Sequence, residues 1–217
     1  MTKRFDLITI FPATCEPYLK GSILGRAAKK KLLDLRVHDL RSFSKDKHHN
    51  VDDTPYGGGP GMVMQVEPFD KAIKKIRTRR KKVRVVMTSA SGKKFTQKDA
   101  KRLAKYDQVI FLCGRYEGVD ARVEKHLADE SLSIGDYVLT GGELPALVMT
   151  DAIARMIPGV LGKSESLEVE SHTVEGLLEY PQYTKPEIYN KWKVPPVLLS
   201  GDHKKIEEWR KDNQKQA

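Results

Sequence analysis

The sequence predicts an α/β domain followed by a small second unit. Short apolar runs of strand length alternate with stretches whose apolar residues recur at helical spacing, which is typical of α/β proteins. Loops rich in glycine and small polar residues accompany these runs, as they do where ligands bind at the carboxyl ends of strands. After Gly162 the chain becomes polar and then rich in proline and aromatic residues, which indicates a separate unit.

The first third of the chain supplies two strands and two helices. Phe5–Ile10 is an apolar run of strand length, and Ser22–Leu33 looks helical. Leu35–Leu40 is predicted as a second strand, and a long polar segment follows it as far as Met62. Apolar residues recur at helical spacing in Glu67–Arg77, so we expect a helix there.

Further elements follow from Val83 onward. Val83–Thr88 is largely apolar and is predicted as a strand. Thr96, followed three residues later by Asp99, resembles a capping box that opens a helix extending through Tyr106. The remaining expected elements are a strand at Val109–Leu112 and helices at Val119–Leu127, Glu143–Met156 and His203–Lys211, with Pro158 and Gly159 closing the second of these helices.

Composition indicates a single main core and a polyanionic partner. A chain of 217 residues can form one good core plus a small appended unit. Its 39 Lys and Arg residues outnumber its 29 Asp and Glu residues, which gives a formal charge of +10. Such an excess favours nucleic acid as partner, although basic runs such as Lys29–Lys31 could equally serve solubility.

The sequence argues against membrane, secretory and metal-binding classes. Its longest apolar runs are too short to span a membrane, and the N-terminus places Asp6 where a signal peptide would be apolar, so we expect a cytoplasmic protein. Cys15 and Cys113 suggest no disulfide framework. His48 and His49 are adjacent and belong to no metal-binding motif, so no metal ligands are predicted.

Three loops combine glycine with polar residues: Val51–Met62, Cys113–Gly118 and Ser133–Pro145. The first is neither a Walker loop nor a dinucleotide fingerprint, and on its own it could be a tight surface turn. The segments Thr88–Gly92 and Cys113–Gly118 follow predicted strands, so they could meet Ser133–Gly142 at one pocket. Backbone amides there would suit an adenine or a ribose, and Glu117 could bind an ammonium group.

One charged pair lies on the expected helix Glu143–Met156. Asp151 and Arg155 are four residues apart and share a helix face. They could form a surface ion pair, or Asp151 could steady Arg155 while its charge stabilises a developing oxyanion. Taken alone, the pair favours the surface ion pair.

Several long motifs in register together resemble one family, TrmD, the bacterial tRNA (guanine-N1)-methyltransferases of the SPOUT class. The similarity extends in order from Phe5 to about Trp209. The matching motifs are Val51–Met62, Cys113–Gly118, Ser133–Pro145, Ile157–Gly162 and Val194–Gly201.

This resemblance implies methyl transfer from S-adenosyl-L-methionine to N1 of the guanosine 3′ to the tRNA anticodon. It implies a knotted parallel sheet flanked by helices in a cofactor-binding domain at residues 1–162. A linker at 163–175 would close over the substrate, and a small helical domain at 176–217 would bind tRNA. It further implies a homodimer with shared active sites and a possible dependence on Mg²⁺.

The resemblance also assigns roles to individual residues. Arg155 and Glu170 match the catalytic arginine and the general base, while Asp52, Gly58, Gly59 and Ser171 would hold the target nucleotide. The S-adenosyl-L-methionine pocket would be formed by Met87, Thr88, Ser89, Gly114, Tyr116, Glu117, Gly118, Ser133, Ile134, Gly135, Tyr137, Leu139, Gly141, Gly142 and Pro145.

The chain departs from the family pattern at several positions. The general base of the family is an aspartate, whereas this chain has Glu170, with Glu168 as a neighbouring candidate. Ala90 and Ser91 replace a common Pro-Gln, Glu179 replaces a frequent aspartate, and the chain ends soon after Trp209. These departures leave open a second hypothesis, a nucleic-acid-binding protein that keeps the scaffold without catalysis.

Overall fold

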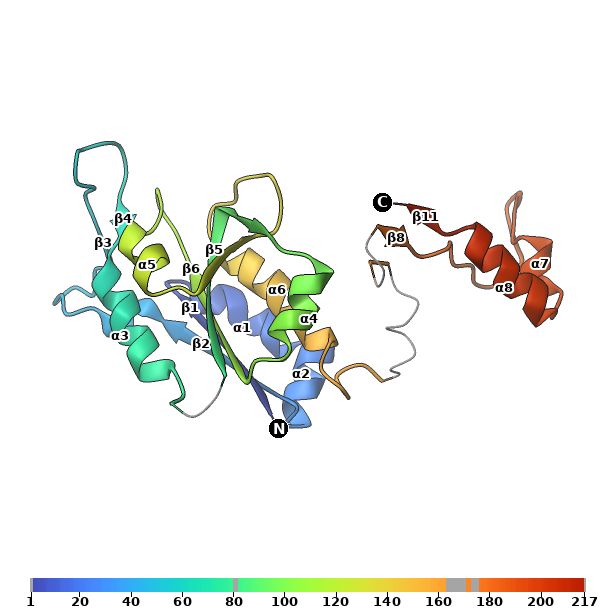
Figure 1. Ribbon diagram of the computed structural model, residues 1–217, viewed down its shortest axis with the longest axis horizontal. Coiled ribbons are helices and arrows are strands. Elements are labelled where there is room, and N and C mark those ends of the chain that lie inside the picture. Colours follow the sequence, from blue (N-terminus) through green and yellow to red (C-terminus); the bar gives the residue numbers. More distant parts are fainter. Residues whose placement is uncertain (1, 80–81, 163–170, 173–175, 217) are drawn as a thin grey trace. The chain divides into compact units, whose positions relative to one another are not determined.

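The computed structural model describes residues 2–79, 82–162, 171–172 and 176–216 (Figure 1). The chain forms two compact units, Met1–Gly162 and Lys163–Ala217, which are described separately below. None of the helices in the described parts of the chain is both long and apolar enough to cross a membrane.

A five-stranded parallel sheet forms the centre of the first unit, in the order β2-β1-β6-β5-β7. Its strands are rich in Val, Ile, Leu and Phe because both faces of the sheet are covered, and every residue of β6 is buried. The predicted α/β fold class is confirmed. The strands are β1 Lys3–Thr9, β2 Leu33–Asp39, β5 Val83–Lys94, β6 Gln108–Cys113 and β7 Glu130–Ser133.

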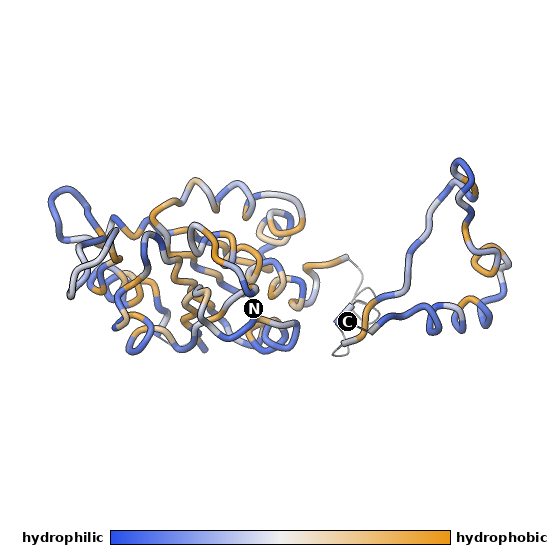
Figure 2. The backbone as a smooth tube through the Cα atoms, turned by 90° about the horizontal axis from the view of Figure 1, so that it is seen from above, coloured by the Kyte–Doolittle hydropathy of each residue, from blue (hydrophilic) through white to orange (hydrophobic). Residues whose placement is uncertain are grey.

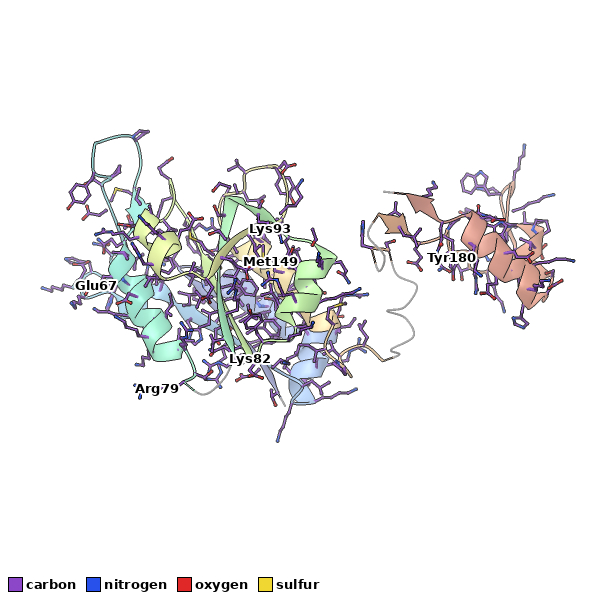
Figure 3. All side chains as sticks on the ribbon, in the orientation of Figure 1. Glu67, Arg79, Lys82, Lys93, Met149 and Tyr180 are labelled. Carbon is purple, nitrogen blue, oxygen red and sulfur yellow. The ribbon has the colours of Figure 1, made fainter. Side chains whose placement is uncertain are left out.

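Helices cover both faces of the sheet and create two apolar cores. Four helices contribute buried residues to one core, where Met149 of α6 is fully buried (Figure 3). Two further helices and the short helix η1 close the opposite core around Phe69. The first group is α1 Pro12–Lys20, α2 Ser22–Lys29, α4 Gln97–Leu103 and α6 Glu143–Arg155; the second is η1 Leu40–Phe43, α3 Val66–Ile76 and α5 Ala121–His126.

The expected strands and helices of this unit are present, with shifted ends. Helix α4 begins after Thr96, and the Oδ2 atom of Asp99 accepts hydrogen bonds from the backbone N–H (3.2 Å) and the hydroxyl (3.0 Å) of Thr96. The elements that the sequence did not predict are α1, η1, β7 and a two-stranded hairpin, β3 Asp52–Asp53 with β4 Val63–Met64.

One loop prediction is wrong. Thr88–Gly92 was expected to be a loop, but these residues lie inside the long strand β5. The pairing of β5 with β7 is irregular between Thr88 and Lys93, so the intervening residues bulge while the strand continues. Small Ser, Ala and Gly side chains permit this bulge, and their composition resembles that of a loop.

The second unit is small, and its longer helix, at residues 203–212, carries few apolar residues. Figure 2 shows apolar residues concentrated in the interior of the first unit, whereas α8 is mostly hydrophilic. Helix α8 His203–Asp212 confirms the helix expected at His203–Lys211 and contains no buried residue. The other elements are β8 Leu177–Leu178 paired with β11 Lys215–Gln216, the hairpin of β9 Ile188–Tyr189 and β10 Trp192–Lys193, and α7 Pro196–Leu199.

Candidate functional site

A cavity of about 320 Å³ opens at the carboxyl ends of β6 and β7, beside the bulged middle of β5. Every residue that the resemblance assigned to the S-adenosyl-L-methionine pocket lines this cavity. Its wall therefore unites residues that lie far apart in sequence, from Met87 to Pro145. Lining residues absent from that assignment are Ala90, Ser91, Arg115, Val119, Leu132, Val138 and Thr140.

Glycines bring the three wall segments into direct backbone contact. The N–H of Gly142 donates to the carbonyl of Gly114 at 2.9 Å. A Cβ atom at position 142 would lie 2.0 Å from Oγ1 of Thr88 and 2.9 Å from Cα of Cys113. Only glycine fits there, which explains why the loop after β7 can close on the ends of β5 and β6.

A buried carboxylate anchors one side of the cavity. Glu143, the first residue of α6, is 1% exposed and accepts hydrogen bonds from the hydroxyl of Thr9 (2.6 Å) and from Nε of Arg115 (2.9 Å). Arg115 also donates to the carbonyl of Thr140 at 3.1 Å and stacks 4.7 Å from the ring centroid of Phe11. This network ties β1, the loop after β6 and the start of α6 together.

Sequence reasoning did not assign these network residues to the site. Arg115 lies within the motif Cys113–Gly118. Glu143 lies within the motif Ser133–Pro145 and is the first residue of an expected helix. An arginine in a glycine loop and a glutamate at a helix N-terminus were the available signals. Neither reveals burial, so only the three-dimensional contact identifies the pair.

Both cysteines lie close to this network and are unreactive. Burial chiefly raises the pKa of the Cys15 thiol to about 11, and the neighbouring carboxylate of Glu143 adds to the effect. The same two causes raise the pKa of Cys113 well above its usual range. Both thiols are therefore neutral at physiological pH, which argues against a cysteine nucleophile.

The hairpin β3–β4 is joined to the cavity wall. The N–H of Glu117 donates to the carbonyl of Met62 at 3.1 Å, and the N–H of Met64 donates to the carbonyl of Gly118 at 2.9 Å. Asp52 pairs with Met64 across the hairpin, so it lies near this junction. Gly58 and Gly59, by contrast, lie in the exposed hairpin loop with positive φ and do not line the cavity.

The charged residues in the C-terminal half of α6, Asp151 and Arg155, do not line the cavity. Arg155 ends the helix that begins with Glu143, so the two Cα atoms are roughly 18 Å apart along the helix axis. Arg155 is not among the lining residues. Asp151 accepts a hydrogen bond from the hydroxyl of Tyr18 at 2.7 Å, a partner that the sequence did not indicate.

The proposed general bases, Glu170 and Glu168, lie outside the described residues. Ser171 is described, and its hydroxyl oxygen accepts a hydrogen bond from the N–H of Glu179 at 3.0 Å within the second unit. Among the described residues, no three or more His, Cys, Asp or Glu side chains lie together in a group that could hold a metal ion.

Comparisons with known proteins identify close relatives. The family model described as tRNA (Guanine-1)-methyltransferase TrmD matches residues 3–217. A tRNA (guanine-N(1)-)-methyltransferase of Arthrobacter sp. (strain FB24) is 50% identical over 97% of this chain and 80% of its own length. Enzymes of the same name from Ruminiclostridium cellulolyticum (51% identical, 95% of this chain, 89% of its own length) and Mycoplasmopsis agalactiae (50%, 96%, 90%) are similarly related.

Proposed function

Since this chain belongs to the TrmD family of tRNA (guanine-N1)-methyltransferases, we propose that S-adenosyl-L-methionine is its methyl donor and that the acceptor is N1 of the guanosine 3′ to the tRNA anticodon. The single observation that carries this proposal is the convergence of three separate segments on one cavity. The family membership favours an enzyme over the alternative of a scaffold that only binds nucleic acid.

The cavity residues are suited to a nucleoside linked to an amino acid. The volume of the cavity, about 320 Å³, falls within the range of small-molecule sites. Ile134, Leu139 and Pro145 offer apolar surface for a purine ring, and Glu117 offers a carboxylate for an ammonium group. When bound, S-adenosyl-L-methionine supplies an electrophilic methyl group on a sulfonium.

The hairpin β3–β4 would hold the target nucleotide beside the donor. The strand end of the hairpin is hydrogen-bonded to residues 117 and 118 of the cavity wall, so a nucleotide held by Asp52 would lie next to the donor pocket. Gly58 and Gly59 would contact this nucleotide from the exposed hairpin loop. Ser171 would add a contact from the segment that follows the first unit. Holding both reactants in this way supplies the alignment that methyl transfer requires.

The acceptor nitrogen must lose a proton during the reaction. Guanine N1 is protonated at neutral pH, so we propose that the carboxylate of Glu170 removes this proton as the bond to carbon forms. Negative charge then develops toward O6 of the base, where the guanidinium of Arg155 would stabilise it.

A shared active site in a homodimer would solve a geometric problem. Arg155 lies roughly 18 Å along α6 from the end of the helix that meets the cavity, so a second copy of the chain could supply this residue. The outer face of α6 carries Leu144 and Val148, which are 57% and 48% exposed and one turn apart. We therefore propose a dimer that buries this face, acting on tRNA in the cytoplasm.

A methylation assay tests the proposal. Purified protein is incubated with radiolabelled S-adenosyl-L-methionine and tRNA transcripts that carry guanosine or another base after the anticodon. We expect transfer only to the guanosine transcript, with the label at N1. Equal labelling of the other transcripts, or no calorimetric heat on adding the donor, would refute the proposed substrates.

The general base is tested separately. Glu170→Gln keeps the side-chain shape but cannot accept the proton, so turnover should fall by at least about 100-fold while donor binding is retained. Glu168→Gln is the matched control and should keep most activity. The reverse result would move the base to Glu168.

A further inference from the structure

The second unit carries a hairpin whose two aromatic residues face each other. Tyr189 of β9 pairs directly with Trp192 of β10, and their ring centroids are 5.8 Å apart with an interplanar angle of 45°. The connecting turn places Asn190 at a φ of 55°, a conformation that Asn tolerates well. The chain therefore fixes two large rings side by side on a tight two-residue turn.

These rings are not used to pack their own unit. Tyr189 is 61% exposed and Trp192 is 71% exposed. Other aromatic residues do pack within the unit. Trp209 is half-buried and lies edge-on against Tyr183, and the guanidinium of Arg210 lies over the ring of Tyr180. Large exposed aromatic pairs indicate a contact surface, because Tyr and Trp combine apolar area with a polar edge.

The charge around the hairpin favours a polyanion as partner. Lys185, Lys191 and Lys193 lie within nine residues that contain a single carboxylate, Glu187. None of these three lysines forms an ion pair with a carboxylate of the described residues. An apolar protein partner would leave these charges without a counterpart, whereas RNA offers phosphates beside stackable bases.

We propose that Tyr189 and Trp192 form a stacking platform for an unpaired base of the tRNA, distinct from the base that is methylated, with the adjacent lysines contacting the phosphates. This inference rests on tRNA as the substrate. Stacking on aromatic rings suits a splayed loop nucleotide, because a base inside a duplex is already stacked on its neighbours. The platform would anchor the substrate at a site other than the reacting base.

Affinity measurements on four variants test the platform. Fluorescence anisotropy with a labelled tRNA transcript is recorded over a range of salt concentrations for Trp192→Ala, Tyr189→Ala, Trp192→Phe and Lys191→Ala. We expect Trp192→Ala and Tyr189→Ala to weaken binding at least about fivefold with an unchanged salt slope. Trp192→Phe should retain most affinity, and Lys191→Ala should lower the salt slope by about one.

Two further measurements separate base stacking from other roles. In a Trp209→Phe background Trp192 is the only tryptophan, and tRNA should quench its fluorescence whereas a transcript of a perfectly paired stem should not. The platform would be overturned if Trp192→Ala bound tRNA as tightly as the wild type, or if it lost as much affinity for the paired stem as for tRNA. It would also be overturned if Trp192→Ala sedimented as a smaller species than the wild type, because a change of assembly would then explain the weaker binding. Wild-type methylation is measured in parallel, so that failure of the catalytic proposal is recognised independently.

Discussion

Individual residues of this chain illustrate how buried charge positions a binding loop. Glu143 is almost fully buried, and its carboxylate receives hydrogen bonds from both Thr9 and Arg115. Arg115 in turn holds the carbonyl of Thr140, which belongs to the cavity wall. A buried carboxylate is costly unless it is paired, so the network is retained only while all three partners are in place.

We expect Glu143→Gln to lower the free energy of unfolding by about 2 kcal/mol, because it removes the charge that faces Arg115 but keeps an acceptor for Thr9. Donor binding should weaken several-fold as the loop at Thr140 loses its anchor. Urea unfolding and calorimetry with S-adenosyl-L-methionine measure the two effects. Glu16→Gln, in an exposed pair with Lys20, is the control and should change stability by less than about 0.5 kcal/mol.

A second buried carboxylate makes stability depend on pH. Burial raises the pKa of Asp6, but hydrogen bonds from His38, Arg4 and Gln108 outweigh it, so the pKa in the folded protein is lowered. A lowered folded-state pKa means that the stabilisation is complete above the unfolded value of about 3.9 and is lost as pH falls through the folded value.

Asp6→Asn should therefore destabilise the protein by about 3 kcal/mol at pH 7, and this difference from wild type should shrink below about pH 4. Urea unfolding at pH 7 and pH 3 gives both values. Asp34→Asn, in a more exposed pair with Arg36, serves as the control. A difference that stays constant with pH would show that the Asp6 charge is not the cause.

Among the secondary-structure elements, β5 shows where sequence patterns fail. Its apolar first half was predicted as a strand, but the bulged continuation through Gly92 resembles a loop in composition. The strand continues because it pairs again with β7 at Lys93, a long-range contact that local propensity does not encode. Strand β7 itself was missed because Glu130 and Ser131 interrupt its apolar character.

Gly92 should tolerate no side chain, because a Cβ there would lie 2.7 Å from backbone atoms of Ser131 and Leu132. We expect Gly92→Ala to cost about 2 kcal/mol through displacement of β7. Gly162→Ala is the matched control, since nothing lies within 4 Å of its added Cβ, and it should stay within about 0.5 kcal/mol of wild type. Thermal unfolding compares the two, and equal melting temperatures would contradict the expected clash.

The candidate site was more predictable than the elements that build it. The resemblance assigned 15 of the residues that line the cavity, and its motifs are rich in glycine where a backbone must approach closely. The anchoring pair of Arg115 and Glu143 could not be foreseen, since burial of a charge depends on the packing of distant segments. The position of Arg155 is likewise a property of helix length and fold.

At the scale of the whole molecule, the proposed dimer would decide whether a complete site exists. Val148→Lys places a charge on the exposed apolar face of α6 and should convert the proposed dimer into a monomer with little activity. Leu199→Lys, at a similarly exposed position in the second unit, should leave the dimer intact. Sedimentation velocity measures both variants.

Mixed dimers test directly whether each active site combines residues from both chains. Arg155→Ala and Glu117→Ala chains should each be nearly inactive alone, yet a mixture should recover activity, because one of its two sites would combine an intact cavity with an intact arginine. A mixture that stays inactive after verified subunit exchange would show that each chain completes its own site.

The junction between the hairpin and the loop after β6 also constrains how such proteins can diversify. The hairpin base is fastened to residues 117 and 118 by backbone hydrogen bonds, so exchanging either segment alone between homologues would disturb its neighbour. The far end of the hairpin has no such tether: added side chains at Gly57 and Gly58 would meet nothing within 4 Å, although their positive φ favours glycine. A change at this end would therefore leave the junction undisturbed. Because Gly58 and Gly59 are proposed to hold the target nucleotide, engineers seeking a new nucleotide preference would begin there.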